Sequence, residues 1–310
     1  TMTAQALSQL EEVVTFSKAN RENNDGRLDL TREALNDMVL YYEDVKKPDD
    51  AVDYFRKWGG DALAGELVLK LGKLYQRHSR YAQLERVFSE LVKSVPLAPE
   101  RPQMHKDLME GAELSHNRER VLSHIETLAE LCQDTSAWVL GQKLESRAEM
   151  QKGCWERLEE AGRYYIGHWH KEVRQTGDKN LVKITRKAYE TLLANDVKLH
   201  TGDKERYEYA ELLFQQQDYR AASDNYHKVA LMTQDKQLRH DGAYGSIVSL
   251  EKAVGDKWSD LDERQFAVLA GDYIKLNPAG QYVTDVKFKK AFIAYEKGKL
   301  DEAAPQLKEL

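Results

Sequence analysis

Histidines are the residues of this chain best suited to metal chemistry, and their spacing argues against a metal site. The sequence contains 9 histidines, of which His168 and His170 form the densest group. Residues two apart on a helix point about 200° away from each other, so these imidazoles do not share one helix face. His116 and His124 flank an expected turn between helices, and no HExxH or CxxC pattern is present. We therefore expect no metal site.

The segment GDALAG, residues 60–65, has the glycine spacing of a phosphate-binding loop but lacks its phosphate-binding residues. Glu66 and Leu67 stand where such a loop requires Lys and Ser or Thr. Since a carboxylate at this position repels phosphate, we expect no nucleotide and no other cofactor. Gly59 and Gly60 are better interpreted as a break between two helical units.

Acid–base and nucleophilic catalysis find no support in the sequence. Carboxylate pairs such as Glu159–Glu160 are adjacent in sequence, at expected turns or solvated faces. General acid–base catalysis needs a convergent, partly buried pair whose pKa values are driven apart. No Ser/His/Asp or Cys/His arrangement forms a recognisable local motif. We therefore expect no catalytic residues and a chain that is not an enzyme.

Composition excludes several classes of function. The net charge of −6 argues against nucleic-acid binding, which needs a basic face to displace counterions from phosphates. No apolar run approaches the roughly 20 residues that cross a bilayer, so no direct membrane insertion is expected. Cys132 and Cys154 are too few for a disulfide framework, and we expect buried free thiols. The alternative is a single bridge between them, which would favour the periplasm.

A recurring pattern of apolar residues predicts the elements that must position any binding site. With 32% charged residues, 6 prolines and no β-branched alternation between tight turns, we expect an all-α fold without a sheet. The clearest segment reads Leu71-Gly72-x-x-Tyr75, then Tyr81-x-x-Leu84-x-x-x-Phe88-x-x-Leu91, and closes on Pro96. Related patterns predict second helices of a pair at Pro48, Tyr219 and Leu300, and weaker ones at Arg118 and Phe266.

These residues resemble the signature of the tetratricopeptide repeat (TPR), a helix–turn–helix of about 34 residues whose copies stack to bury a common core. The resemblance implies one right-handed superhelical solenoid of seven or eight antiparallel helix pairs over residues 1–310. Clearer repeats are expected near 32–65, 65–98, 203–236 and 284–310, and degenerate repeats with longer helices near 100–200 and 237–280. Because terminal repeats need a solvated outer face, we expect a fragment of a longer repeat protein.

Two segments, residues 241–254 and 285–307, also resemble long TPR proteins from the cell envelope of Gram-negative bacteria, some of which glide or prey on other bacteria. This second resemblance implies a periplasmic or envelope-associated location. A cytoplasmic location is the alternative.

In TPR proteins, the first helix of each pair lines a concave surface that binds extended peptides or partner helices. Projected onto this chain, that pattern implies partner-binding roles for Asn36, Lys70, Lys73, Arg77, Tyr207, Glu211, Phe214, Phe288, Phe292 and Tyr295. Lys73 has no matching Asn or Lys pair in the neighbouring unit, so we do not expect a clamp for a C-terminal carboxylate. Phe288, Phe292 and Tyr295 form an exposed aromatic stripe, or are covered by a following repeat, or, in a shifted helical register, are part of the core.

The leading functional hypothesis is a non-catalytic scaffold that binds other proteins or peptide segments through this concave face, within a bacterial envelope assembly. The alternative is a module that binds a small ligand or a cell-wall fragment at the irregular helix pair 137–175. Aromatic residues gather in that segment, namely Trp155, Tyr164, Tyr165 and Trp169. They would pack a core under the first hypothesis and line a pocket under the second.

Overall fold

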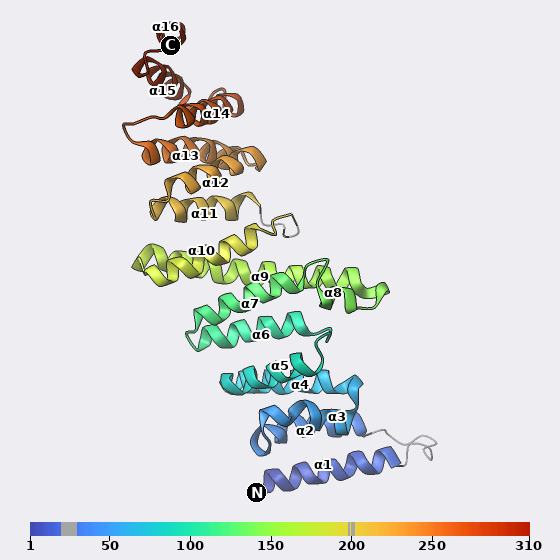
Figure 1. Cartoon of the computed structure of the whole chain (residues 1–310). Coiled ribbons are helices and arrows are strands. Elements are labelled where there is room, and N and C mark those ends of the chain that lie inside the picture. The colour runs from blue at the N-terminus through green and yellow to red at the C-terminus, as the bar shows by residue number, and fades with distance from the viewer. Residues whose placement is uncertain (20–29, 198, 200–201) are drawn as a thin grey trace. The chain divides into compact units, whose positions relative to one another are not determined.

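The computed structural model describes residues 1–19, 30–197, 199 and 202–310. Sixteen α-helices and one short 3₁₀ helix cover this part of the chain, and no strand occurs in it (Figure 1). The prediction of an all-α fold is confirmed. The helix count within the described residues also agrees with the expected seven or eight helix pairs.

The chain divides into two compact units, Thr1–Tyr165 and Ile166–Leu310, and the boundary falls inside one long helix, α9 (Leu144–Thr176). The helices that precede α9 are α1 (Met2–Ala19), α2 (Thr31–Val45), η2 (Pro48–Asp50), α3 (Ala51–Gly59), α4 (Asp61–Arg77), α5 (Tyr81–Ser94), α6 (Arg101–Leu114), α7 (Arg118–Leu131) and α8 (Ala137–Gly141). Those that follow it are α10 (Lys179–Leu193), α11 (Asp203–Gln215), α12 (Tyr219–Met232), α13 (Lys236–Val254), α14 (Asp260–Leu276), α15 (Val283–Glu296) and α16 (Leu300–Lys308).

Each helix packs mainly against its neighbours in the chain. In the first unit α4 contacts α5 and α6 contacts α7, and α4 also contacts α2, the first helix of the preceding pair. In the second unit α12 contacts α11 and α13, and α15 contacts α16. The apolar residues of the repeat pattern form these contacts, since Tyr75, Leu84 and Phe88 are all buried. The continuous right-handed solenoid over residues 1–310 stays a prediction.

A common turn joins the two helices in four of the pairs, α4–α5, α6–α7, α11–α12 and α15–α16. The residue two positions before each second helix has a positive φ, and these residues are Ser79, His116, Gln217 and Gly298. The next backbone N–H donates back across the turn, as from Arg80 to the Tyr75 carbonyl at 2.8 Å. This is the Schellman geometry, which ends one helix and directs the chain into the next. The second helices consequently begin at Tyr81, Arg118, Tyr219 and Leu300, as the sequence pattern predicts.

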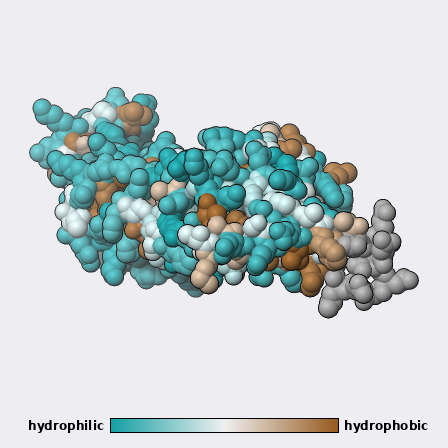
Figure 2. Space-filling model, turned by 90° about the horizontal axis from the view of Figure 1, so that it is seen from below, coloured by the Kyte–Doolittle hydropathy of each residue, from teal (hydrophilic) through white to brown (hydrophobic). Residues whose placement is uncertain are grey.

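The face of the molecule drawn in Figure 2 is mainly hydrophilic. Figure 2 shows one face, on which hydrophobic residues form small separate groups among charged and polar ones. None of the described helices combines the length and the apolar character needed to span a bilayer.

Candidate functional site

The partner-binding residues predicted for the first unit do not form one free surface. Lys70 on α4 donates from Nζ to Asn36 Oδ1 on α2 at 2.5 Å, and it pairs with Glu66 Oε1 at 2.9 Å. Lys73 and Arg77 lie on the same helix and are exposed. Two of the four predicted side chains thus join α2 to α4, and two face solvent.

The second unit contains an open groove that gathers three of the predicted residues. Tyr207, Glu211 and Phe214 of α11 line it, and its volume is about 590 Å³, within the usual range for ligand sites. The sequence places them three or four residues apart, which is why they share one face of α11. The opposite wall and floor are formed by α12, α13 and the segment between α14 and α15, with Tyr226, Gln237, His240, Asp241, Tyr244, Gly245, Val248, Ala279, Gly280, Gln281 and Tyr282.

Aromatic side chains support one another along this groove. The rings of Tyr244 and Tyr282 stack at 3.9 Å between centroids, and the His240 ring stacks on Tyr282 at 5.8 Å. Tyr273 lies beneath them, fully buried, with its hydroxyl 3.0 Å from His240 Nε2. These contacts hold the segment 279–282 against α13, so this wall of the groove is preorganised.

The opposite end of the groove is acidic and contains tyrosine. Tyr207 packs edge-on against Tyr226 at 5.3 Å between ring centroids, and the Tyr226 hydroxyl donates to Glu211 Oε1. Burial, followed by the negative charges of Glu211 and Asp241, raises the pKa of Tyr207 to about 12. Burial and the hydrogen bond to Glu211 also raise the pKa of Tyr226. Glu211 thus acts on both phenol groups, and Asp241 acts on that of Tyr207.

The α13 side of the groove was not predicted from the sequence. Gln237, Asp241, Tyr244 and Val248 recur every three or four residues, so they form one polar and aromatic stripe on this helix. Gln237 Nε2 donates to both Asp241 carboxylate oxygens, at 2.9 and 3.0 Å, which fixes the carboxylate. This periodicity could have predicted a polar and aromatic face on α13, but it does not reveal which helix that face lies against.

The three aromatic residues predicted on α15 lie at the surface. All three side chains are exposed: Phe288, Phe292 and Tyr295. The Phe292 ring stacks on that of Phe288, with 5.9 Å between centroids, and on that of Tyr295, with 6.5 Å between centroids. The alternative that these residues are core in a shifted register is wrong, because all three are exposed in the structure. The role of this stripe in binding stays a prediction.

The aromatic residues of segment 137–175 are largely core residues. Trp155, Tyr165 and Trp169 are buried, while Tyr164 is 69% exposed. Trp138, also buried, donates from Nε1 to the Ala98 carbonyl at 2.8 Å. Burial of these side chains favours the core-packing interpretation over a pocket centred on them.

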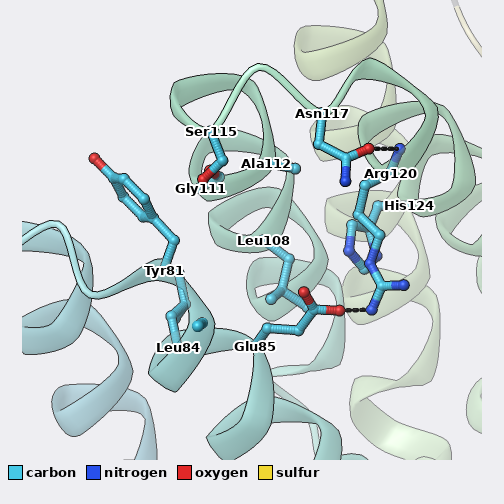
Figure 3. Close-up of a pocket in the computed structure, with 11 residues that line it drawn as sticks. Tyr81, Leu84, Glu85, Leu108, Gly111, Ala112, Ser115, Asn117, Arg120 and His124 are labelled. Carbon is cyan, nitrogen blue, oxygen red and sulfur yellow. Dashed lines mark hydrogen bonds and ion pairs between the residues drawn. The ribbon is translucent and has the colours of Figure 1, made fainter.

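A smaller pocket of about 200 Å³ lies in the first unit, between α5, α6 and α7. Figure 3 shows Arg120 and Glu85 directed toward each other, and they form an ion pair. Asn117 Oδ1 accepts from the Arg120 backbone N–H at 3.1 Å, which caps α7. Because its charged side chains already pair with each other, this pocket has less to offer a ligand than the groove.

The prediction of free thiols is wrong in the structure. Cys132 and Cys154 form a disulfide with their Cα atoms 5.6 Å apart, and both residues are fully buried. The expected burial is correct. The pairing depends on the way α9 returns alongside the end of α7, which local sequence does not specify.

The histidines form no metal centre in the described part of the chain, where no group of three potential ligands is placed to hold an ion. His168 is exposed and His170 is buried, as residues two apart on a helix require. His105 and His124, on α6 and α7, bring their Nδ1 atoms to 3.3 Å. Burial lowers the pKa of His105 to about 3 and that of His124 to about 4, so both are neutral at pH 7.

Comparisons with known proteins do not assign the chain to a family. No protein-family model matches the chain, and neither does any curated protein. Among solved structures, the chain is similar to one described as a circular tandem repeat protein with novel repeat topology and enhanced subunit contact surfaces. That match covers 98% of this chain and 76% of the other, at 15% identity and a TM-score of 0.34. So weak a superposition carries no argument about fold or function.

Proposed function

We propose that this chain is a TPR-type, non-catalytic scaffold that binds a segment of a partner protein in the groove of α11, α12 and α13. The observation that carries the proposal is the groove itself. It places Tyr207, Glu211 and Phe214, predicted independently as a binding face, opposite a wall of stacked aromatic rings. Rigid aromatic side chains provide large contact area at a small cost in conformational entropy, as at protein interfaces.

The mechanism of such a scaffold is passive. An extended segment would lie along α11 with its side chains between the Tyr207 and Tyr244 walls. The half-buried tyrosines would supply apolar contact through their rings and hydrogen bonds through their hydroxyls. No chemical step is part of the proposal, and neither a metal nor a cofactor is required.

We place the scaffold in an oxidising compartment, with the periplasm or cell envelope as the proposed location. The disulfide between Cys132 and Cys154 supports this, because such bonds persist in secreted and periplasmic proteins and are rare in the cytosol. The resemblance of residues 241–254 and 285–307 to envelope proteins points the same way.

The test is a quantitative pull-down from separated envelope, periplasmic and cytoplasmic fractions of the source cells, with mass spectrometry. The variant Tyr207→Ala/Phe214→Ala removes the aromatic face of α11. The matched control, Leu261→Ala/Val268→Ala, removes two exposed apolar side chains of α14 that lie outside the groove.

We expect that the wild type and the control retain a set of partner proteins that the groove variant loses. We also expect these partners to come from an oxidising compartment. Circular dichroism and thermal melting establish that each variant folds. Equal recovery of every partner by all three proteins would show that the groove is not the binding surface.

A further inference from the structure

The acidic end of the groove combines aromatic rings with carboxylates, and both kinds of group attract a positively charged ligand. Among the described residues that line it, Glu211 and Asp241 supply two carboxylates, and no lysine or arginine is present. Five tyrosine and phenylalanine rings share the lining with them. An aromatic ring attracts a cation to its face, and a nearby carboxylate adds to that attraction.

Further carboxylates act on the same surface. Glu208 contributes to the raised pKa of Tyr207, while Glu251 and Asp285 contribute to that of Tyr244, after burial and the neighbouring Tyr282. Glu208 pairs with Arg174, and Glu251 Oε1 pairs with Lys289 Nζ at 3.4 Å, so the negative charge of the groove is concentrated at Glu211 and Asp241 of its lining. A ligand that carries positive charge is attracted to these two carboxylates, and an acidic ligand is repelled.

The cations nearest the groove are already engaged. Lys252 Nζ lies 5.7 Å from the ring centroid of Phe214 and 5.9 Å from that of Tyr219, at the far end of the groove. Arg174 Nη2 pairs with Glu208 Oε2 at 3.4 Å. The Phe214 end thus already holds an ammonium group over aromatic rings, whereas the lining at the Tyr207 end supplies rings and carboxylates without a cation.

We propose that the Tyr207 end of the groove binds the cationic side chain of a lysine or arginine in the partner segment. The cation lies against the Tyr207 ring and between the Glu211 and Asp241 carboxylates. This inference rests on the proposed function and adds the chemical class of the partner, a basic extended segment. Two ion contacts and one ring contact provide the selectivity.

The experiment uses fluorescence anisotropy at 150 mM salt with four labelled tetrapeptides of arginine, lysine, citrulline and glutamate. Citrulline has nearly the shape of arginine without its charge. We expect the arginine and lysine peptides to bind at least about tenfold more tightly than citrulline, and glutamate not to bind. The ratio of arginine to lysine affinity identifies which cation the site prefers.

Variants separate this site from general attraction to an acidic protein. Glu211→Gln/Asp241→Asn should weaken binding of the basic peptides by about tenfold or more. The control Asp256→Asn/Glu296→Gln removes the same charge from exposed positions outside the groove and should leave affinity within about twofold. Tyr207→Leu should weaken binding by about three- to fivefold, while Tyr207→Phe, which keeps the ring, should retain most of it.

Equal binding of citrulline and arginine peptides, no measurable binding of either basic peptide, or equal losses in the two charge variants would each overturn the inference. These results leave the proposed function standing if the Tyr207→Ala/Phe214→Ala variant still loses its native partners. If that variant keeps every partner while basic peptides bind as expected, the cation site exists and the scaffold proposal fails.

Discussion

At the scale of single residues, Gly72 is the position of the repeat pattern where a larger residue would clash most severely with a neighbouring helix. A Cβ atom at this position would lie 2.2 and 2.3 Å from two ring carbons of Phe88, a fully buried residue of α5. The ring cannot retreat into a filled core, so the contact must be relieved by moving α4 away from α5. We predict that Gly72→Ala lowers the free energy of unfolding by roughly 1–3 kcal/mol, measured by urea unfolding.

Gly271 of α14 is the matched control, because a Cβ atom there would meet nothing within 4 Å. Gly271→Ala should raise the free energy of unfolding by up to about 1 kcal/mol, since alanine loses less backbone entropy in a helix. If both substitutions stabilise the protein, α4 and α5 are not packed as closely as the structure shows.

At the scale of helices, the Cys132–Cys154 bond joins the residue after α7 to α9 across a sequence separation of 22 residues. A cross-link of this length restricts the unfolded chain, which corresponds to about 3 kcal/mol in the chain-entropy model. We predict a decrease of that size in the free energy of unfolding when the bond is reduced, measured by urea unfolding with and without a phosphine reductant.

The sequence contains 2 cysteines, so a change caused by the reductant is attributable to this bond. The variant Cys132→Ala/Cys154→Ala should unfold identically with and without reductant. Two reactive thiols per chain in unreduced, urea-unfolded protein would contradict the bridge, and with it the argument for an oxidising compartment.

The helix pairs can be predicted from this sequence, whereas only part of the groove can. The second helices begin at Tyr81, Tyr219 and Leu300 as predicted because a local turn sets each start. The groove depends on how the consecutive helices α11, α12 and α13 pack and on where the segment between α14 and α15 lies against them. Tyr282 reaches Tyr244 only because the segment after α14 returns over α13, and no local pattern specifies that return. The sequence therefore predicted the α11 wall of the groove but not the wall formed by α13 and the segment between α14 and α15.

At the scale of the whole molecule, buried neutral histidines make stability depend on pH. Burial lowers the pKa of His105, His124 and His170 below the ordinary value of 6.5, to about 3, 4 and 4. Below pH 6.5 the unfolded chain therefore binds protons that the folded chain does not, and the free energy of unfolding decreases as pH falls. Each such proton contributes up to about 1.4 kcal/mol per pH unit.

We predict a marked loss of stability between pH 7 and pH 5, measured by urea unfolding at each pH. This window separates histidines from carboxylates such as Glu66, whose pKa is lowered by Lys70 and whose contribution is lost only as pH falls below about 4.5. The variant His105→Leu/His124→Leu should be less sensitive to pH, because it removes two groups that take up protons on unfolding. In the described structure the Nε2 atoms of both imidazoles lack a hydrogen-bond partner, and the two Nδ1 atoms contact each other. The double substitution therefore leaves no other buried polar group without its partner.

His168→Gln is the control, since this exposed imidazole lies on the outer face of α9. Its pH profile should match that of the wild type, whereas the profile of His105→Leu/His124→Leu should be flatter by the contribution of two protons. A double variant as sensitive to acid as the wild type would place the titrating groups elsewhere.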